Sequence, residues 1–144
     1  MNSASAQHSL VAQLEAELLP LLRKALPVLE AQAPSARSSV FAYPVGSATS
    51  FQGFNVGISC ILSGVPDSQP DEVSLVVCVC YLNERPRLNA DVTWGDGYVE
   101  AELSHGASSS EHWPFATPER YSEIRAELPR LISVLGQAAQ RGRP

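Results

Sequence analysis

Hydrophobic and polar residues alternate along residues 90–103, read ADVTWGDGYVEAEL, as they do in a β-hairpin. Asp96-Gly97 is a favoured two-residue turn, because a type I′ turn requires positive φ at both central positions. With this turn at the tip, one face is apolar and carries Ala90, Val92, Trp94, Val99, Ala101 and Leu103. The other face carries Asp91, Thr93, Gly95, Tyr98, Glu100 and Glu102. The pattern predicts one core face and one acidic face, with Asp91 opposite Glu102 and Glu100 diagonal to Asp91.

The same kind of pattern predicts further strands before the hairpin. Strands are expected at about 39–45, 51–63, 73–82, 88–95 and 98–104. In the first of these, Phe41, Tyr43 and Val45 share one face, and Pro44 indicates a strand at the edge of the sheet. The second alternates like a half-buried strand, with Phe54 at the start of its apolar face. The third is apolar on both faces, which predicts a central position in the sheet.

Helices are expected on either side of the strands, over residues 6–33 and 118–140. Leucines recur at spacings of three and four in the first helix. Pro20 and Pro27 predict that this helix bends, or breaks near Leu19, because proline removes a backbone donor and clashes with the preceding turn. Thr117 and Pro118 suit the N-cap and first position of the second helix. The final Arg-Gly-Arg-Pro is expected to fray.

This order of elements predicts an α+β fold. Short connections between successive strands favour an antiparallel meander of about five strands. The N- and C-terminal helices are expected to pack together on one face of that sheet, because each buries an apolar stripe. A length of 144 residues suits a single domain.

Composition and charge narrow the class of protein. The chain is 44% hydrophobic and 17% charged, which is typical of a globular domain, and its net charge is −5. Residues 40–113 hold nine carboxylates but two arginines, so the negative charge belongs to the predicted sheet. This balance disfavours nucleic acid and favours a basic partner. Because no apolar run is long enough to span a bilayer and no secretory signal is evident, we expect a cytoplasmic protein without a membrane partner.

The acidic face of the hairpin is the leading candidate site. Two carboxylates directly opposite each other are unfavourable unless a positive group lies nearby. The residues expected to contact a protein partner are Asp91, Thr93, Asp96, Tyr98, Glu100, Glu102 and Trp113. The alternative is a solvated face whose charge prevents edge-to-edge aggregation. A metal site is not expected, because none of the familiar cation-binding loop spacings is present.

The cysteines and histidines give weaker signals. Cys78-x-Cys80, with Cys60, could bind a soft metal, but a second ligand pair is missing and buried cysteines are common in sheets. His105, Glu111 and His112 precede the last helix without a recognisable nucleophile motif, so no catalytic residue and no cofactor is expected.

The aromatic residues Trp113 and Phe115 just before the last helix are either an anchor over the core or an exposed contact patch. A second apolar strip is expected on the strand 73–82, made either of Val77, Val79 and Tyr81 or of Val76, Cys78 and Cys80. If both helices cover one side of the sheet, the strip on the other side predicts a homodimer or a partner interface.

We therefore expect a non-catalytic protein-binding module. In size, charge and layout the chain resembles the immunity proteins that neutralise bacterial toxins and the small acidic secretion chaperones, which implies an inhibitor of a basic toxin or a chaperone-like dimer. One alternative is a small enzyme or ligand-binding domain whose pocket lies between sheet and helices near His105 and His112. Another is a structural subunit of a larger assembly.

Overall fold

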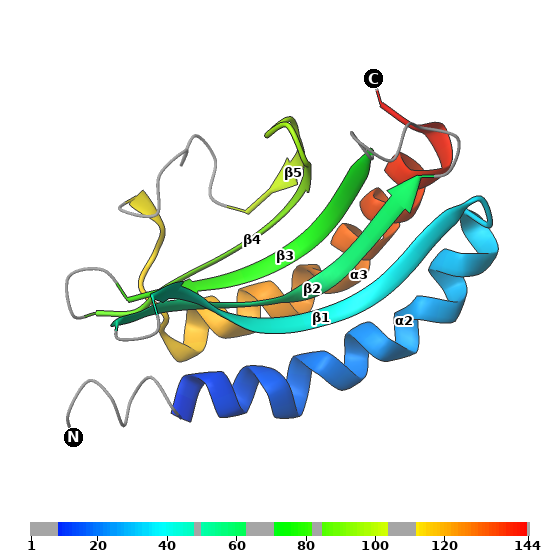
Figure 1. Cartoon of the computed structure of the whole chain (residues 1–144). Coiled ribbons are helices and arrows are strands. Elements are labelled where there is room, and N and C mark those ends of the chain that lie inside the picture. Colours follow the sequence, from blue (N-terminus) through cyan, green and yellow to red (C-terminus); the bar gives the residue numbers. More distant parts are fainter. Residues whose placement is uncertain (1–8, 48–49, 63–70, 82–84, 104–111, 144) are drawn as a thin grey trace.

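The computed structural model describes residues 9–47, 50–62, 71–81, 85–103 and 112–143. Residues 9–32 form one continuous helical segment, and five strands and a long helix follow it (Figure 1). The elements in order are η1 (Leu14–Leu18), α2 (Leu19–Gln32), β1 (Ala36–Ser47), β2 (Ser50–Leu62), β3 (Glu72–Cys80), β4 (Arg87–Trp94), β5 (Val99–Glu102) and α3 (Pro118–Arg141). The strands pair antiparallel in the order β1-β2-β3-β4-β5, which confirms the predicted α+β meander.

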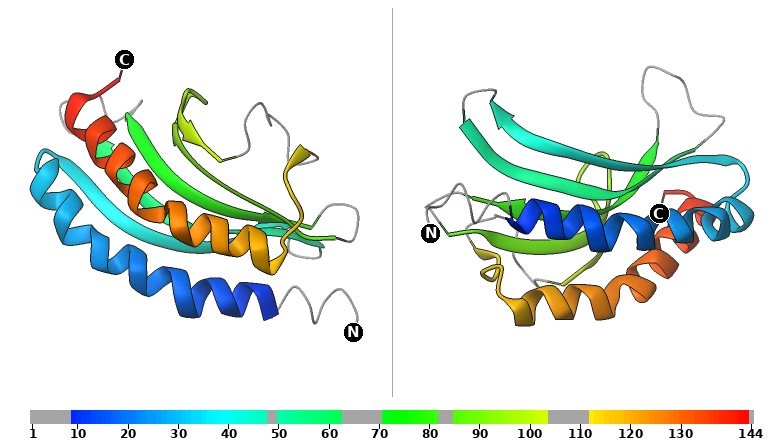
Figure 2. Two further views of the ribbon diagram at one scale, coloured as in Figure 1. Left: turned by 180° about the vertical axis from the view of Figure 1, so that it is seen from behind. Right: turned by 90° about the horizontal axis from the view of Figure 1, so that it is seen from below.

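Both helices lie on the same side of the sheet, as predicted. The α2 helix packs on β1 and β2, and α3 packs on β3, β4 and β5 as well as on α2. The strands curve away from the helices, so that the helices follow the convex side and the opposite face is concave (Figures 1 and 2). We call this concave side the uncovered face.

The core lies between the sheet and the two helices. One residue from each strand forms a covered row across the sheet: Val40, Ile58, Leu75, Val92 and Ala101. Leu22 of α2 and Leu131 of α3 are fully buried above this side of the sheet. Val77, Val79 and Tyr81 belong to the core side, so the apolar strip on the uncovered face is the one made of Val76, Cys78 and Cys80.

The first helix widens at the position where a bend or break was expected. In η1 the backbone N–H of Leu19 donates to the carbonyl of Leu14, five residues earlier, which is the pattern of a π-helix. The helix stays continuous through this turn, and Pro20 follows it directly in the first turn of α2. Leu14, Leu18 and Leu22, which are spaced four residues apart, are all fully buried.

The ends of the other elements follow recognisable local signals. Thr117 caps α3, because its side-chain oxygen accepts from the backbone N–H of Arg120 at 3.1 Å. The edge strand β1 contains Pro44, as predicted, but it begins at Ala36 rather than at residue 39. No helix in the described ranges is both long and apolar enough to cross a membrane.

Candidate functional site

The tip of the hairpin differs from the predicted two-residue turn. The backbone N–H of Trp94 donates to the carbonyl of Tyr98 at 2.8 Å, and the N–H of Gly97 donates to the carbonyl of Trp94 at 2.8 Å. Three residues, Gly95, Asp96 and Gly97, therefore form the loop. Gly97 has a φ of 97°, which few residues other than glycine adopt, and this is the usual geometry of a three-residue hairpin loop that ends in a bulge.

The longer loop changes which residues of the two strands lie opposite each other. The pairs Asp91–Glu102 and Val92–Ala101 lie in the predicted register, but Thr93 pairs with Val99. Glu100 is the extra residue of the bulge. Val99, which was expected in the core, is 41% exposed, and the expected diagonal contact between Glu100 and Asp91 is not formed.

Glu100 instead lies on the helix side of the hairpin. Its carboxylate accepts a hydrogen bond from the indole Nε1 of Trp94 at 2.7 Å. The same oxygen pairs with the guanidinium of Arg141 at the end of α3. Because the Trp94 side chain is buried, this carboxylate supplies the acceptor that its N–H needs.

The expected fraying of the segment after α3 is wrong for the residues that the structure describes. Arg143 pairs with Asp96 at 2.7 Å and with Asp71 at 2.8 Å, and its guanidinium carbon lies 5.9 Å from the centre of the Trp94 ring. Two of the predicted contact residues, Asp96 and Glu100, are thus paired with arginines of the same chain. Residues 114–144 hold five arginines and three glutamates, and this excess of positive charge is the sequence signal for pairing with the acidic sheet.

Across the uncovered face, one row of paired residues runs through all five strands. From β1 to β5 it consists of Phe41, Gly57, Val76, Asp91 and Glu102. At the spacing of neighbouring strands, about 4.8 Å, this row spans roughly 19 Å. The row is aromatic and apolar on β1 to β3 and acidic on β4 and β5, so the uncovered face has two chemically different margins.

In the acidic margin, the half-buried carboxyl group of Asp91 lies beside that of Glu102. Burial raises the pKa of Asp91 to about 6, the hydrogen bond from Thr93 lowers it, and the neighbouring Glu102 carboxylate raises it further. The bond from Thr93 Oγ1 to Asp91 Oδ1 is long, at 3.4 Å. A positive group placed here would favour the charged form of Asp91.

The aromatic margin depends on a glycine. A Cβ atom at Gly57 would lie 1.9 Å from the carbonyl oxygen of Leu75 and 2.8 Å from Cζ of Phe41. The Phe41 ring therefore lies over the bare backbone of β2, and its centre is 5.4 Å from that of Tyr43. Tyr43 is 48% exposed, so its ring is available to a partner.

Polar atoms and thiols lie beside the row that runs from Phe41 to Glu102. Tyr43, Asn55, Cys78 and Asn89 form the next row across four strands. The side-chain oxygen Oδ1 of Asn55 is buried and has no hydrogen-bond partner among the residues described. Burial, Cys80 and Asp91 raise the pKa of the Cys78 thiol to about 12, so it stays protonated and unreactive at neutral pH. Cys60 is on the covered face and fully buried, and Cys78 and Cys80 are half-buried.

The segment before α3 lies beside the start of β4. The backbone N–H of Leu88 donates to the carbonyl of Pro114 at 3.0 Å, and Arg87 donates to the carbonyl of Trp113 at 2.6 Å. The guanidinium carbons of Arg85 and Arg87 lie 3.5 and 4.2 Å from the centre of the Phe115 ring. Trp113 is thus half-buried at the side of β4 away from the hairpin tip, and the structure does not bring it to the acidic margin.

A buried arginine connects α3 to β4. Nε of Arg120 donates to the carbonyl of Leu88 at 2.9 Å, and Nη2 donates to Oδ1 of Asn89 at 3.0 Å. Arg120 is 5% exposed, and its Nη1 lies 3.3 Å from the carboxylate of Glu123. The sequence does not indicate that Arg120 joins α3 to β4, because this contact depends on where α3 crosses the sheet.

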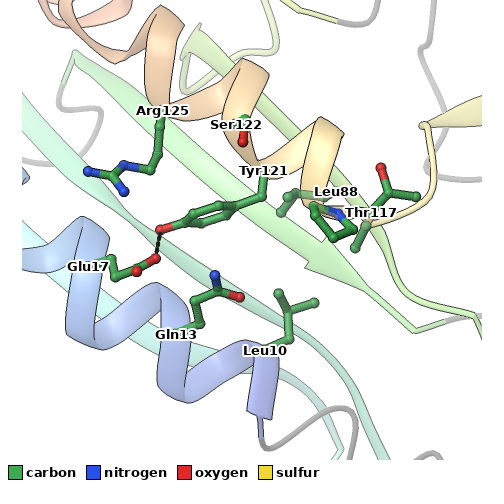
Figure 3. Close-up of a pocket in the computed structure, with 10 residues that line it drawn as sticks. Leu10, Gln13, Glu17, Leu88, Thr117, Tyr121, Ser122 and Arg125 are labelled. Atoms are coloured by element: carbon green, nitrogen blue, oxygen red, sulfur yellow. Dashed lines mark hydrogen bonds between the residues drawn. The ribbon is translucent and has the colours of Figure 1, made fainter.

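A pocket of about 350 Å³ lies elsewhere, between the first helical segment and the start of α3 (Figure 3). Leu10, Leu88 and Pro118 give it apolar walls. The Tyr121 ring reaches from α3 toward the first helical segment, and its hydroxyl donates to the Glu17 carboxylate. Burial and this hydrogen bond raise the pKa of Tyr121, so the phenol is neutral.

The pocket is not the one predicted beside the histidines. His112 and Trp113 do not line it, and His105 and Glu111 lie outside the described residues. Its lining offers two hydrogen-bonding groups on the first helical segment, Gln13 and Glu17.

No group of three histidine, cysteine or acidic side chains in the described part of the chain could hold a metal ion. On the uncovered face the described side chains offer aromatic rings, the buried acceptor Asn55 Oδ1 and a pair of carboxylates. Comparison with protein-family models, with curated proteins and with solved structures finds no match to this chain.

Proposed function

We propose that this protein is a binding module that holds a basic amphipathic helix of a partner protein in its uncovered face. The observation that carries the proposal is the row from Phe41 to Glu102, which crosses a concave sheet face that neither helix covers. Apolar side chains of the partner would pack on Phe41 and Val76, and a lysine or arginine would reach Asp91 and Glu102.

A helix suits this face better than an extended strand. The interior strands β2, β3 and β4 already have neighbours on both sides, so the face offers side chains rather than free backbone groups. A helix with its side chains is about 10–12 Å wide and fits within the roughly 19 Å width of the row. The buried acceptor Asn55 Oδ1 lies in the next row, where it could receive a donor from the partner.

Electrostatics supports a basic partner over a neutral one. Asp91 and Glu102 are direct neighbours across two strands, and a cation between them would offset both their repulsion and the burial of Asp91. Inhibition of a basic toxin, as in an immunity protein, is one form of this function. Complementary charge would mainly accelerate association, and the rate would fall as salt is added.

The test compares proteins captured from the source cell by four forms of the chain. We expect one partner to be retained by wild type and lost by Asp91→Asn/Glu102→Gln and by Tyr43→Ala. The matched control, Glu15→Gln/Glu30→Gln, removes the same charge from exposed positions on the helical side and should retain it. Association of the purified pair should slow by about tenfold or more in the double variant. Equal capture by all four forms would contradict the proposal.

A second candidate function is binding of a small amphipathic molecule in the pocket beside Tyr121. The volume of about 350 Å³ favours it, because small-molecule sites usually measure about 300–1,000 Å³. Screening a fragment library against protein with labelled methyl groups tests it: a ligand should shift Leu10, Leu88 and Ala116 together. If no fragment moves these methyl signals, this function is ruled out.

A further inference from the structure

The helix side of the hairpin holds two guanidinium groups in a compact acidic site. Arg141 pairs with Glu100, and Arg143 pairs with both Asp96 and Asp71. Gly142 between them has a φ of 87°, and the side chains on both sides of it pair with carboxylates of the hairpin. The carboxylates come from separate parts of the chain, namely the residue before β3, the loop at the hairpin tip and the bulge of β5.

The site contains more than negative charge. The Trp94 indole lies beneath Arg143 and fixes one of the carboxylates, because its Nε1 donates to Glu100. Glu100 is 12% exposed, and only its place in the bulge brings it to this side. A planar guanidinium can bond a carboxylate through two N–H groups and lie against an aromatic ring, whereas an ammonium group cannot do both as well.

We propose that a second recognition surface, specific for an arginine-Xaa-arginine segment of a partner protein, lies on the helix side of the hairpin. We call it the paired-arginine site, and its residues are Asp71, Trp94, Asp96 and Glu100. In the structure Arg141 and Arg143 of the same chain occupy it, and a partner segment of the same chemistry would displace them. The site is separate from the uncovered face, so it does not depend on the function proposed for that face.

Exposure of the resident arginines makes displacement feasible. Arg141 is 49% exposed and Arg143 is 42% exposed, and pairs between such side chains are individually weak. Their attachment to α3 nevertheless gives them a local concentration in the millimolar range. A free segment must compete with that concentration, which means that removing the resident side chains should strengthen its binding.

The experiment uses the Trp94 indole N–H as a local reporter in spectra of 15N-labelled protein. The probe is the peptide acetyl-Gln-Arg-Gly-Arg-amide at low ionic strength, titrated into wild type and into Arg141→Gln/Arg143→Gln. We expect the peptide to shift the Trp94 signal in both proteins and to bind the double variant about tenfold more tightly. Arg125→Gln/Arg130→Gln, which removes the same charge from exposed positions earlier in α3, should bind like wild type.

Two further titrations test specificity. A peptide with lysine in place of both arginines should bind the double variant at least fivefold more weakly, and adding Asp71→Asn and Asp96→Asn should abolish binding of the arginine peptide. The proposal fails if the Trp94 signal of the double variant does not respond to millimolar peptide. It also fails if wild type and the double variant bind the peptide equally. Neither result involves Asp91, so neither bears on the function of the uncovered face.

Discussion

The indole N–H of Trp94 donates to the Glu100 carboxylate at 2.7 Å, although simple alternation would place these two side chains on opposite faces of the hairpin. Replacing Glu100 by Gln keeps an oxygen acceptor for the buried indole and removes the charge that pairs with Arg141. Replacing it by Ala leaves the indole N–H without this acceptor. We expect a loss of about 1 kcal/mol or less for Glu100→Gln and about 1–3 kcal/mol for Glu100→Ala. Urea unfolding curves of both variants measure the difference, and equal losses would show that the hydrogen bond contributes nothing.

The loop at the hairpin tip gives a second prediction. Gly97 has a φ of 97°, and any other residue there is strained. We expect Gly97→Ala to lower the free energy of unfolding by about 1–3 kcal/mol. Gly95→Ala is the control, because its Cβ would meet only the carbonyl oxygen of Glu72 at an ordinary 3.8 Å. Thermal unfolding of the two variants should separate them clearly, and an unchanged melting temperature for Gly97→Ala would contradict the three-residue loop.

The contacts of Arg120 predict that removing this one side chain from α3 lowers the free energy of unfolding substantially. Arg120→Met leaves the carbonyl of Leu88 and the side-chain oxygen of Asn89 without the donors described above. We expect a destabilisation of about 2–4 kcal/mol, because unsatisfied buried acceptors are costly. Arg130→Met is the control, since the pair that Arg130 forms with Glu127 is exposed and should contribute less than about 1 kcal/mol. Chemical unfolding that shows similar small losses for both would contradict a structural role for Arg120.

The carboxyl group of Asp91 predicts a dependence of stability on pH. Its pKa is about 6 in the folded protein, above the value of about 3.9 in an unfolded chain. The folded state therefore binds the proton more tightly, and the contribution of Asp91 to the free energy of unfolding falls as pH rises from about 4 to about 6. We expect Asp91→Asn to be more stable than wild type by about 1–2 kcal/mol at pH 7, after allowance for solvent screening, and equally stable below about pH 4.

The measurement is the urea midpoint of wild type and Asp91→Asn at several pH values. Glu30→Gln, a charge change at an exposed position of α2, should show no such pH-dependent difference from wild type. A constant difference between Asp91→Asn and wild type from pH 4 to 7 would mean that this carboxyl group titrates normally in the folded protein.

Much of the architecture was readable from local pattern. Alternation located the strands and placed Asp91 opposite Glu102, and leucine spacing located the helices. The conformation of the hairpin tip could not be read from local pattern, because Gly95-Asp96-Gly97 is compatible with both a two-residue and a three-residue loop. The longer loop lets Glu100 reach Trp94 and Arg141, a contact between residues distant in sequence that no local window contains.

The candidate site was predictable to a similar degree. The acidic pair follows from the register of one hairpin, and the position of the aromatic margin follows from alternation in β1. The two margins lie on one uncovered face because both helices pack on the other side of the sheet. The sequence does not determine that side, since both faces of β3 are apolar enough to form the core. The pocket beside Tyr121 has no local signal, since its walls come from the first helical segment, β4 and α3.

The π turn of the first helix contains one residue more than an α-helical turn, and Pro20 follows this turn directly. A π turn is equivalent to an α-helix with one residue inserted, so deleting Ala16 would restore ordinary helical spacing and keep Leu10 and Leu22 in phase. The same deletion would place Pro20 inside a regular helix, where its ring clashes with the carbonyl four residues earlier. Insertion and proline thus compensate each other. A sequence that lost either feature alone would be disfavoured, whereas losing both together would restore α-helical hydrogen bonding at this turn.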